Sequence, residues 1–418
     1  MLVTRLGLAL LFACFGLGCA TLDHMGLFRS TVRADDLDGS GEVIPEEAIS
    51  SLEDESTPAE AEVRDATGSE AAEEEEGKEP PARGEPFIAP IPFRSPQIGW
   101  GGALAGGYIF RIDPEDEQSP PSTVGGGAFG TENGSFGGVA SFKGYLWEDL
   151  WRFSLTTAAF RVDYEYFGIG SDAGEEGFSV DLRSETFLLM LDALRRLPTE
   201  RLGRFGERLF LGPVLEFKTS ETELQHSFTL PPGFGFPSLD ETQMSLGLRL
   251  QRDTRDDSFY PEAGTLSELT IQLFDDAFGG DDDYRIYDAS LKRYHLLLPD
   301  TVAAWRVFSR FAEGDVPFTA LPEHDLRGYE RGRYRDKVHL AAEVELRQHI
   351  YKRLGGVAFA GLGQVAPKIG KLDTENILWS AGFGVRFRLT EENRMNYRSD
   401  VAWGRNGFEF YFSLSEEF

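Results

Sequence analysis

Cysteine, basic charge and long apolar runs are all scarce in this sequence of 418 residues. The two cysteines, Cys14 and Cys19, lie within the first twenty residues, so the rest of the chain can form neither a disulfide framework nor a thiolate metal site. The 41 Lys and Arg against 70 Asp and Glu give a net charge of −29. That balance excludes a protein that binds nucleic acid by neutralising phosphates with clustered basic side chains. After the first twenty residues no apolar run approaches the 18 residues of a membrane-spanning helix.

Signatures of enzymes are also missing. The sequence has no GxSxG, no HExxH and no glycine-rich phosphate loop between a strand and a helix, and its six histidines are scattered. We therefore expect no enzymatic activity, no catalytic residues and no required cofactor. Glycine and aromatic residues are abundant instead, with 47 Gly and 33 Phe against 5 Met, a composition that is rare in a soluble helical enzyme.

The first twenty residues have the pattern of an export signal. A single positive charge in residues 1–5 precedes an apolar run over residues 6–17 and the small residues Gly18, Cys19 and Ala20. The run is too short to span a membrane as a helix. Cys19 is also a candidate lipidation site, as in lipoprotein signals, although Gly16 stands where a branched apolar residue is usual. The alternative is a buried N-terminal helix, which the acidic segment that follows disfavours.

An acidic linker is predicted over residues 21–85. Between residues 31 and 85 there is no Phe, Tyr or Trp, and 19 acidic residues face four basic ones. So little apolar surface cannot offset the conformational entropy lost on folding, so this segment is expected to be disordered.

One part of the linker, residues 36–47, resembles the calcium loop of an EF-hand. Oxygen ligands fall at positions 1, 3 and 5, glycine stands at position 6, and a glutamate ends the loop at position 12. The candidate ligands are Asp36, Asp38, Ser40, Glu42 and Glu47. The alternative is an acidic linker with an accidental match, because no second copy of the loop exists to pair with it.

Calcium binding by this loop is expected to be weak. A peptide covering residues 25–56 should bind Ca²⁺ with a dissociation constant of about 10⁻⁴–10⁻³ M, as extracellular-type sites do. Glu47→Ala should abolish binding because it removes the bidentate ligand. Isothermal calorimetry tests both, and no heat at millimolar calcium would identify the segment as plain linker.

Residues 86–418 alternate between apolar and polar side chains with a period of two. In residues 338–349 the apolar side chains include Leu340, Val344 and Leu346, and the opposite face carries Glu343 and Arg347. Residues 242–254, 376–390 and 407–418 repeat this pattern. Because side chains alternate across a strand, each segment is a strand with one apolar face and one strongly polar face.

A transmembrane antiparallel β-barrel explains this pattern better than a soluble sandwich. The segments run ten to fourteen residues, which suits a tilted crossing of the bilayer and exceeds the usual globular strand. Their polar faces carry several charges each, as expected for a water-filled lumen. An exported chain without a spanning helix can cross a membrane only as a closed barrel. We therefore predict an all-β fold in the outer membrane of a Gram-negative-type bacterium, with the linker in the periplasm.

Fifteen strands can be counted from residue 99 to the end of the sequence. Bacterial barrels usually have an even number, so we expect 16 strands, with residues 87–94 as the additional one. Pro90 and Pro92 confine that segment to an edge position. Short turns such as residues 298–301 are expected on the periplasmic side, and the long links 220–241 and 314–337 outside.

Two motifs and the end of the sequence resemble the BamA/TamA superfamily, also called the bacterial surface antigen family. Leu326, Arg327, Gly328 and Tyr329 resemble its (V/I)RG(F/Y) signature, and five strands follow them. A DxRD…PxxG pattern, three strands earlier, resembles the family's turn motif. The final strand, which ends in phenylalanine, resembles the signal read by the barrel-assembly machinery. The turn motif comprises Asp253, Arg255, Asp256, Pro261 and Gly264, and the final strand carries Phe408, Phe410, Phe412 and Phe418 on one face.

The resemblance implies positions for these residues. In such relatives the signature loop folds into the lumen, so Arg327 is expected near Glu343, Glu345 or Asp400 on the barrel wall. Apart from the resemblance, Arg331, Arg333 and Arg335 are expected to form ion pairs between loop and wall, and the alternative is an anion-binding site. Relatives that insert or secrete proteins also carry periplasmic POTRA domains, which the acidic linker cannot form. A separate POTRA-type partner could supply them.

Two classes of function remain. The first is insertion of outer-membrane proteins or their translocation through a weak seam, formed by residues 99–107 and 408–418. The second is a passive pore or a structural, lipid-contacting barrel. For both classes the expected partners are outer-membrane lipid and the assembly machinery that inserts the chain itself.

Overall fold

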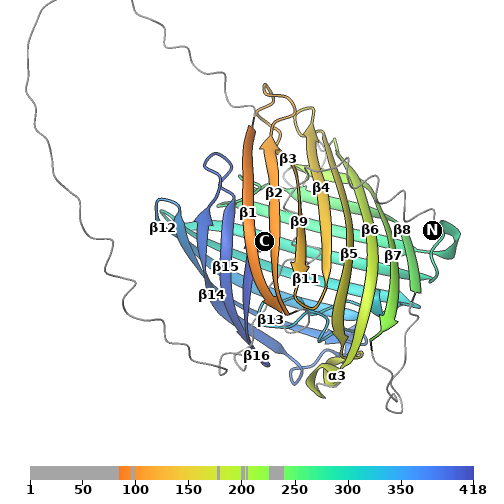
Figure 1. Cartoon of the computed structure of the whole chain (residues 1–418). Helices are drawn as coiled ribbons and strands as arrows, with labels where there is room; N and C mark the ends of the chain where they lie inside the picture. The colour runs from red at the N-terminus through yellow and green to blue at the C-terminus, as the bar shows by residue number, and fades with distance from the viewer. Residues whose placement is uncertain (1–83, 96–98, 177–178, 199–202, 204–205, 226–239) are drawn as a thin grey trace, which may run out of the picture. The chain divides into compact units, whose positions relative to one another are not determined.

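In the computed structural model, sixteen antiparallel strands form one sheet, in which each strand pairs with its neighbours in sequence (Figure 1). The structure describes residues 84–95, 99–176, 179–198, 203, 206–225 and 240–418. The predicted signal peptide, Cys19, the linker and the calcium loop lie outside these residues. No helix in the described part of the chain is both long and apolar enough to cross a bilayer.

The first eight strands are β1 (Gly84–Ser95), β2 (Gly99–Phe110), β3 (Ser122–Thr131), β4 (Phe136–Leu146), β5 (Trp151–Tyr166), β6 (Val180–Arg196), β7 (Leu209–Leu224) and β8 (Asp240–Asp253). The last eight are β9 (Gly264–Phe274), β10 (Tyr284–Leu298), β11 (Thr301–Gly314), β12 (Val338–Tyr351), β13 (Leu354–Ala366), β14 (Leu378–Arg388), β15 (Asn396–Gly404) and β16 (Gly407–Leu414). Short helices interrupt four of the links: α3 (Ser171–Glu176), η4 (Asp276–Phe278), η5 (Phe318–Ala320) and η6 (Ile369–Lys371).

The count of sixteen strands is confirmed, and the additional strand is the first one, β1. β1 begins at Gly84, two residues before the expected start of the barrel, and contains Pro86, Pro90 and Pro92. It is an edge strand, the position that its prolines allow. The expected final strand, in contrast, is shorter than predicted, because β16 ends at Leu414.

The outer surface carries the apolar faces. On β12, Leu340, Val344 and Leu346 are 41–50% exposed, whereas Glu343 and Arg347 are buried on the inner face. Exposed leucines line β8 and β9 in the same way. A sheet that turns large apolar side chains outward and buries charges inside suits a lipid environment.

Introducing a charge on this outer face should be costly at the middle of a strand. Val344→Arg, halfway along β12, is expected to lower the free energy of unfolding by about 2–4 kcal/mol if position 344 lies near the bilayer midplane. Gln348→Arg, also outward but near the strand end, should cost only about 0–1 kcal/mol. Urea unfolding in lipid measures both. Equal costs would contradict the orientation of β12 in the membrane.

The inner face is not uniformly polar as we expected. On β10 and β11 the inward Asp288 and Arg310 are 35% and 44% exposed, so this part of the lumen is open to solvent. On β1 to β5 the inner face is mainly apolar, whereas the wall from β11 to β15 is densely charged. Elsewhere both walls are buried, because the link between β11 and β12, the end of the chain and apolar packing fill the space between them. The buried apolar side chains of the first wall are Phe87, Ala89, Ile91, Phe93, Ala103, Ala105, Ile109, Phe129, Val139 and Ala158.

Candidate functional site

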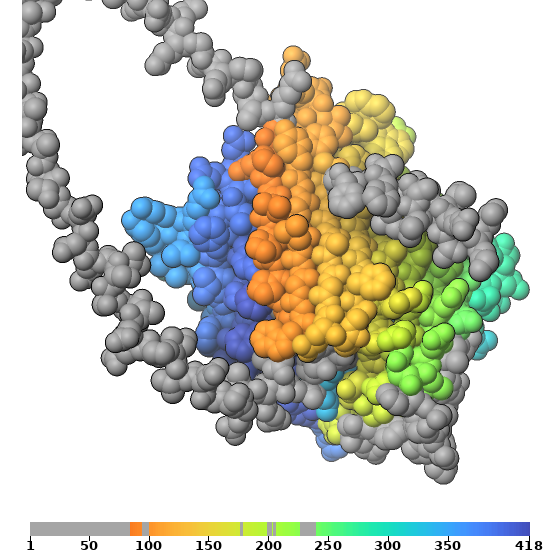
Figure 2. Space-filling view, viewed as in Figure 1, coloured from red at the N-terminus to blue at the C-terminus, as the bar shows by residue number. Residues whose placement is uncertain are grey.

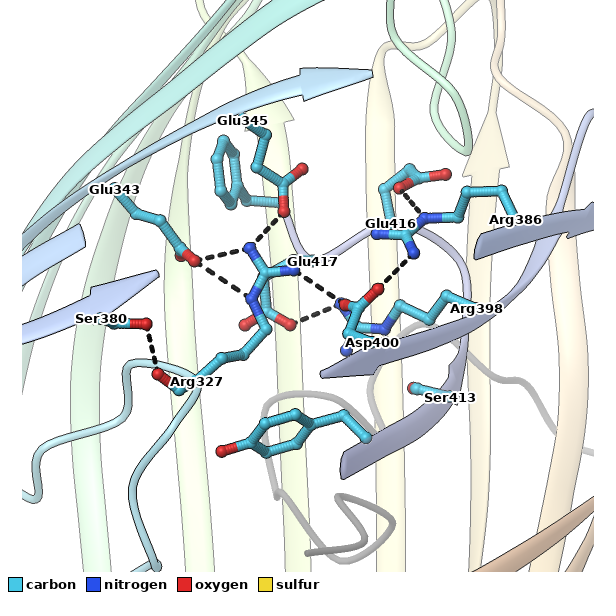
Figure 3. A network of polar contacts seen from close by, with 12 residues as sticks. Arg327, Glu343, Glu345, Ser380, Arg386, Arg398, Asp400, Ser413, Glu416 and Glu417 are labelled. Atoms are coloured by element: carbon cyan, nitrogen blue, oxygen red, sulfur yellow. Dashed lines mark hydrogen bonds and ion pairs between the residues drawn. The ribbon is translucent and has the colours of Figure 1, made fainter. Parts of the chain in front are cut away.

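The link between β11 and β12 folds inward and brings Arg327 to the charged wall (Figure 3). The Arg327 guanidinium donates to Glu343 Oε1 from Nε at 3.1 Å and from Nη2 at 2.5 Å. Its Nη1 donates to Asp400 Oδ2 at 2.8 Å, and its Nη2 also contacts Glu345. All three acidic residues proposed as partners therefore contact Arg327. The four side chains have no solvent exposure.

Electrostatics and packing hold this arginine in its charged form. Burial lowers the pKa of Arg327, but the negative charges of Glu343, Glu345 and Asp400 outweigh that effect and raise the pKa well above the ordinary value. The guanidinium carbon also lies 3.4 Å from the ring centroid of Phe359, a cation–π contact. Arg327 is thus a fixed, fully desolvated anchor of the loop.

The other signature residues fix the backbone beside this anchor. Gly328 has a φ of 97°, and a Cβ there would lie 2.8 Å from the backbone of Trp403, so only glycine fits. The Gly328 amide donates to the Tyr411 hydroxyl on β16 at 2.6 Å. The Tyr329 hydroxyl donates to the Trp379 carbonyl on β14 at 2.6 Å, and Leu326 is buried. The signature therefore ties the loop to three of the last four strands of the barrel, including β16.

The remaining charges of the loop pair with one another rather than with the wall. Arg335 contacts Glu323 at 2.9 Å, and Arg331 lies 3.8 Å from the same carboxylate. Arg333 pairs with Glu330 at 3.4 Å. The expected pairs between loop and wall are therefore wrong for Arg333 and Arg335, because the loop folds back on itself and supplies their partners.

A buried histidine completes the packing of the loop. Burial, together with the nearby His339, lowers the pKa of His324 to about 3, so its ring is neutral at physiological pH. The ring packs edge-on against Tyr329, with centroids 4.7 Å apart. His324 is thus an apolar packing element, which no local sequence pattern indicated.

The sheet closes on itself without a ladder. β1 and β16 lie side by side, but within the described strands β1 pairs only with β2, and β16 only with β15. In the space-filling view the orange first strand borders the blue last strands (Figure 2). We call this junction the seam. It was expected at residues 99–107, but those belong to β2, because β1 precedes them.

Three prolines explain why no ladder forms at the seam. A proline has no N–H, so in an antiparallel ladder it can occupy only a position whose backbone groups point away from the partner strand. Pro86, Pro90 and Pro92 are all at even-numbered positions of β1, so their backbone nitrogens point to the same side of the strand. Because β1 pairs with β2 along its length, the nitrogens that do not take part in this ladder point away from β2. Their missing donors therefore all face the seam. The ladder between β6 and β7 shows the same effect, since its pairing is interrupted beside Pro213.

Side chains hold the seam instead. Phe87 and Ile91 of β1 belong to the same apolar cluster as Leu414 of β16. At the end of the barrel where β1 begins, Glu85 accepts hydrogen bonds from the link between β14 and β15. The donors are the backbone amides of Glu391 (2.6 Å) and Asn393 (3.3 Å) and Asn393 Nδ2 (3.0 Å). The seam is therefore closed by apolar packing and by one carboxylate, not by backbone pairing.

The turn motif braces the same end of the barrel. Arg255 forms a two-pronged contact with Asp253, at 2.9 and 3.0 Å, and Asp253 also accepts from Arg152 at 2.9 Å. Asp256 accepts from the amides of residues 262 and 263, which closes the turn. Gly264 has a φ of 100°, and Pro261 is buried.

From this turn, contacts reach the link next to the seam. Arg394 pairs with Asp257 at 3.2 Å and with Glu262 at 3.1 Å. Phe259 joins the apolar cluster of the seam. The turn between β8 and β9 thus supports the link that holds β1.

The end of the chain corrects another expectation. Phe408, Phe410 and Phe412 lie on β16 with their side chains outward, but Phe418 does not continue that face. Ser415 has a φ of 64°, and the chain turns there into the lumen, where Phe418 is 7% exposed. The reason is a set of inward arginines on other strands that bind residues 416–418, which a period-two reading of one strand cannot reveal.

Cation sites have little support among the described residues. One group of three carboxylates lies close enough to share an ion, Asp275, Asp276 and Asp283, in the link between β9 and β10. Two of the three are exposed, and nothing else in their surroundings indicates a ligand.

The fold and the internal anchor define a transmembrane β-barrel with an inward signature loop and an unpaired seam. Residues 237–418 match the Omp85 superfamily domain. Among solved structures, the chain resembles CdiB from Acinetobacter baumannii, with a TM-score of 0.50 and 13% identity. That match covers 79% of this chain and 59% of CdiB, less than two thirds of its length. It also matches BamA from Haemophilus ducreyi lacking POTRA domains 1–3, with a TM-score of 0.48 and 14% identity over 79% of this chain and 70% of that one. No curated protein matches.

Residues 237–418 are therefore an Omp85 superfamily domain, and the described chain has a BamA/TamA-like barrel fold, a kind of fold found in the outer membrane of Gram-negative bacteria.

Proposed function

We propose that the protein inserts polypeptides into the outer membrane, or translocates them across it, by opening the seam between β1 and β16. The observation that carries this proposal is the absence of a ladder between these described strands, together with the three prolines on the β1 edge. Each backbone hydrogen bond contributes about 0.5–1.5 kcal/mol, so a seam without them opens at lower cost than any other junction in the sheet. The function needs no catalytic residue and no cofactor.

The alternative, a passive pore, agrees less well with the interior. Arg327, Glu345 and Arg398 have no solvent exposure although they stand between the barrel walls. A conducting lumen would hydrate such charges. The packing around the signature loop instead favours a lateral route through the wall.

Capture of a client is expected to need help from another chain. The described residues before β2 form only the edge strand β1, and we propose that a separate periplasmic POTRA-type protein delivers clients to the seam. Such a partner would act at the end of the barrel where β1 begins and where Glu85 contacts the link between β14 and β15.

Reconstitution in liposomes tests the proposal. The full chain should accelerate the folding of an added outer-membrane barrel over protein-free liposomes. A matched control carries Phe87→Cys and Leu414→Cys, with Cys14 and Cys19 replaced by serine, and is cross-linked across the seam with a cleavable thiol reagent. The cross-linked protein should lose the acceleration and regain it on cleavage. Ion conductance without acceleration, or acceleration that survives cross-linking, would contradict a function through the seam.

A further inference from the structure

Residues 416–418 occupy a built site on the charged wall. Four inward arginines surround them, one each from β11, β12, β14 and β15, and we call this set the arginine cage: Arg306, Arg347, Arg386 and Arg398. The side chains of the cage are at most 9% exposed.

The two glutamates of the segment fill the cage with carboxylates. Glu416 accepts from Arg386 Nε at 2.8 Å and lies 3.7 Å from Arg347 Nε. Glu417 accepts from Arg306 Nη2 at 3.4 Å and also pairs with Arg398 (Figure 3). Both glutamate side chains are at most 2% exposed, so these are desolvated contacts rather than surface ion pairs.

The aromatic ring that follows is recognised separately. Phe418 lies beneath two guanidinium groups, with its centroid 5.2 Å from the Arg306 carbon and 5.4 Å from that of Arg347. Arg347 Nη2 donates to the Phe418 carbonyl at 2.7 Å. The ring packs with Tyr294 and Ala304 on β10 and β11.

The segment supplies part of the negative charge that faces the cage. The cage and Arg327 carry five positive charges, and Glu343, Glu345 and Asp400 on the wall carry three negative ones. Glu416 and Glu417 add two more. A buried guanidinium that loses its carboxylate partner is strongly unfavourable, so the two glutamates stabilise the cage.

We propose that the arginine cage is a peptide-binding site for a segment with two adjacent carboxylates followed by an aromatic ring. Residues 416–418 are its internal ligand. They follow β16 directly, so their binding holds the end of that strand inside the barrel and keeps the seam closed. Another polypeptide segment of the same chemistry would compete for the cage and release β16. This regulatory consequence rests on the proposed function, but binding itself does not.

Hydrogen–deuterium exchange of the full chain in lipid nanodiscs tests the proposal without any client. Glu416→Gln with Glu417→Gln should accelerate exchange of the β16 amides at least tenfold and leave β8 unchanged. Glu221→Gln with Glu223→Gln, two exposed glutamates on β7, is the matched control and should change nothing in β16. The single variants Glu416→Gln and Glu417→Gln should give smaller accelerations, and they provide the test if the double variant does not fold.

A peptide added in trans tests the ligand chemistry. An amidated peptide with the sequence of residues 413–418 should bind the double variant and slow the exchange of β16 again, whereas the same peptide with both glutamates replaced by glutamine should not. Unchanged β16 exchange in the folded double variant would overturn the internal ligand. Accelerated exchange that the acidic peptide fails to slow, or that both peptides slow equally, would overturn the cage as a binding site. Neither experiment contains a client protein, so a negative result in either one can be distinguished from a failure of the protein to insert clients.

Discussion

Arg327→Ala is expected to lower the free energy of unfolding of the barrel by about 3–5 kcal/mol, the cost of leaving buried carboxylates without their partner. Three fully buried acids, Glu343, Glu345 and Asp400, contact this one guanidinium. The variant should still reach the membrane but lose heat-modifiable mobility on gels. Residues 328–335 should become cleavable by protease added from outside, because the loop is no longer anchored.

Two further variants make this prediction specific. Arg327→Lys should rescue only in part, because an ammonium group cannot contact three carboxylates in the plane of a guanidinium fork. Arg331→Ala, in the same loop, removes a partly exposed arginine that lies 3.8 Å from its partner Glu323. It should cost about 0–1 kcal/mol. If Arg327→Ala retains wild-type mobility and protease resistance, this arginine does not anchor the loop.

Replacing Pro86, Pro90 and Pro92 together by valine is expected to close the seam. The substitutions restore three N–H donors on the β1 edge that faces β16. At about 1 kcal/mol for each new hydrogen bond, the opening equilibrium should fall on the order of 100-fold. Exchange of the β1 amides should slow accordingly, and acceleration of client folding in liposomes should be lost.

Pro213→Val is the matched control, because it restores a donor between β6 and β7, away from the seam. It should leave both the exchange of β1 and client folding unchanged. A triple variant that folds and still opens and inserts like the wild type would show that the prolines do not determine the seam.

The period-two pattern predicted the outer surface because it depends only on neighbours in sequence. Each strand alternates independently of the others, so Leu340 and Val344 could be placed outward from one segment alone. The local pattern was not sufficient for the first strand, because its prolines disfavour a strand inside a sheet. Only the order of all sixteen strands shows that β1 lies at the edge of the sheet.

The interior could be predicted only where a family motif pointed to it. The partners of Arg327 followed from the signature and from the inward faces of β12 and β15. The position of Phe418 could not be predicted, because the four arginines of its site come from four different strands. They lie as many as 92 residues apart in the sequence, from Arg306 to Arg398. The period-two pattern assigns side chains to the two faces of a strand but does not show what packs against the inner face. It therefore could not predict that the signature loop and residues 416–418 lie inside the barrel.

The prolines of β1 also affect the geometry of the barrel as a whole. In a fully closed barrel, ladders around the whole circumference fix the shear number, and with it the tilt of the strands and the diameter. Sixteen strands here form only fifteen ladders, so no backbone register links β1 to β16. β1 can slide along β16 without breaking a main-chain hydrogen bond at that junction, and the cross-section can widen or narrow as it slides. The hydrogen bonds of Glu85 with the link between β14 and β15 tie the start of β1 to that link and oppose such sliding.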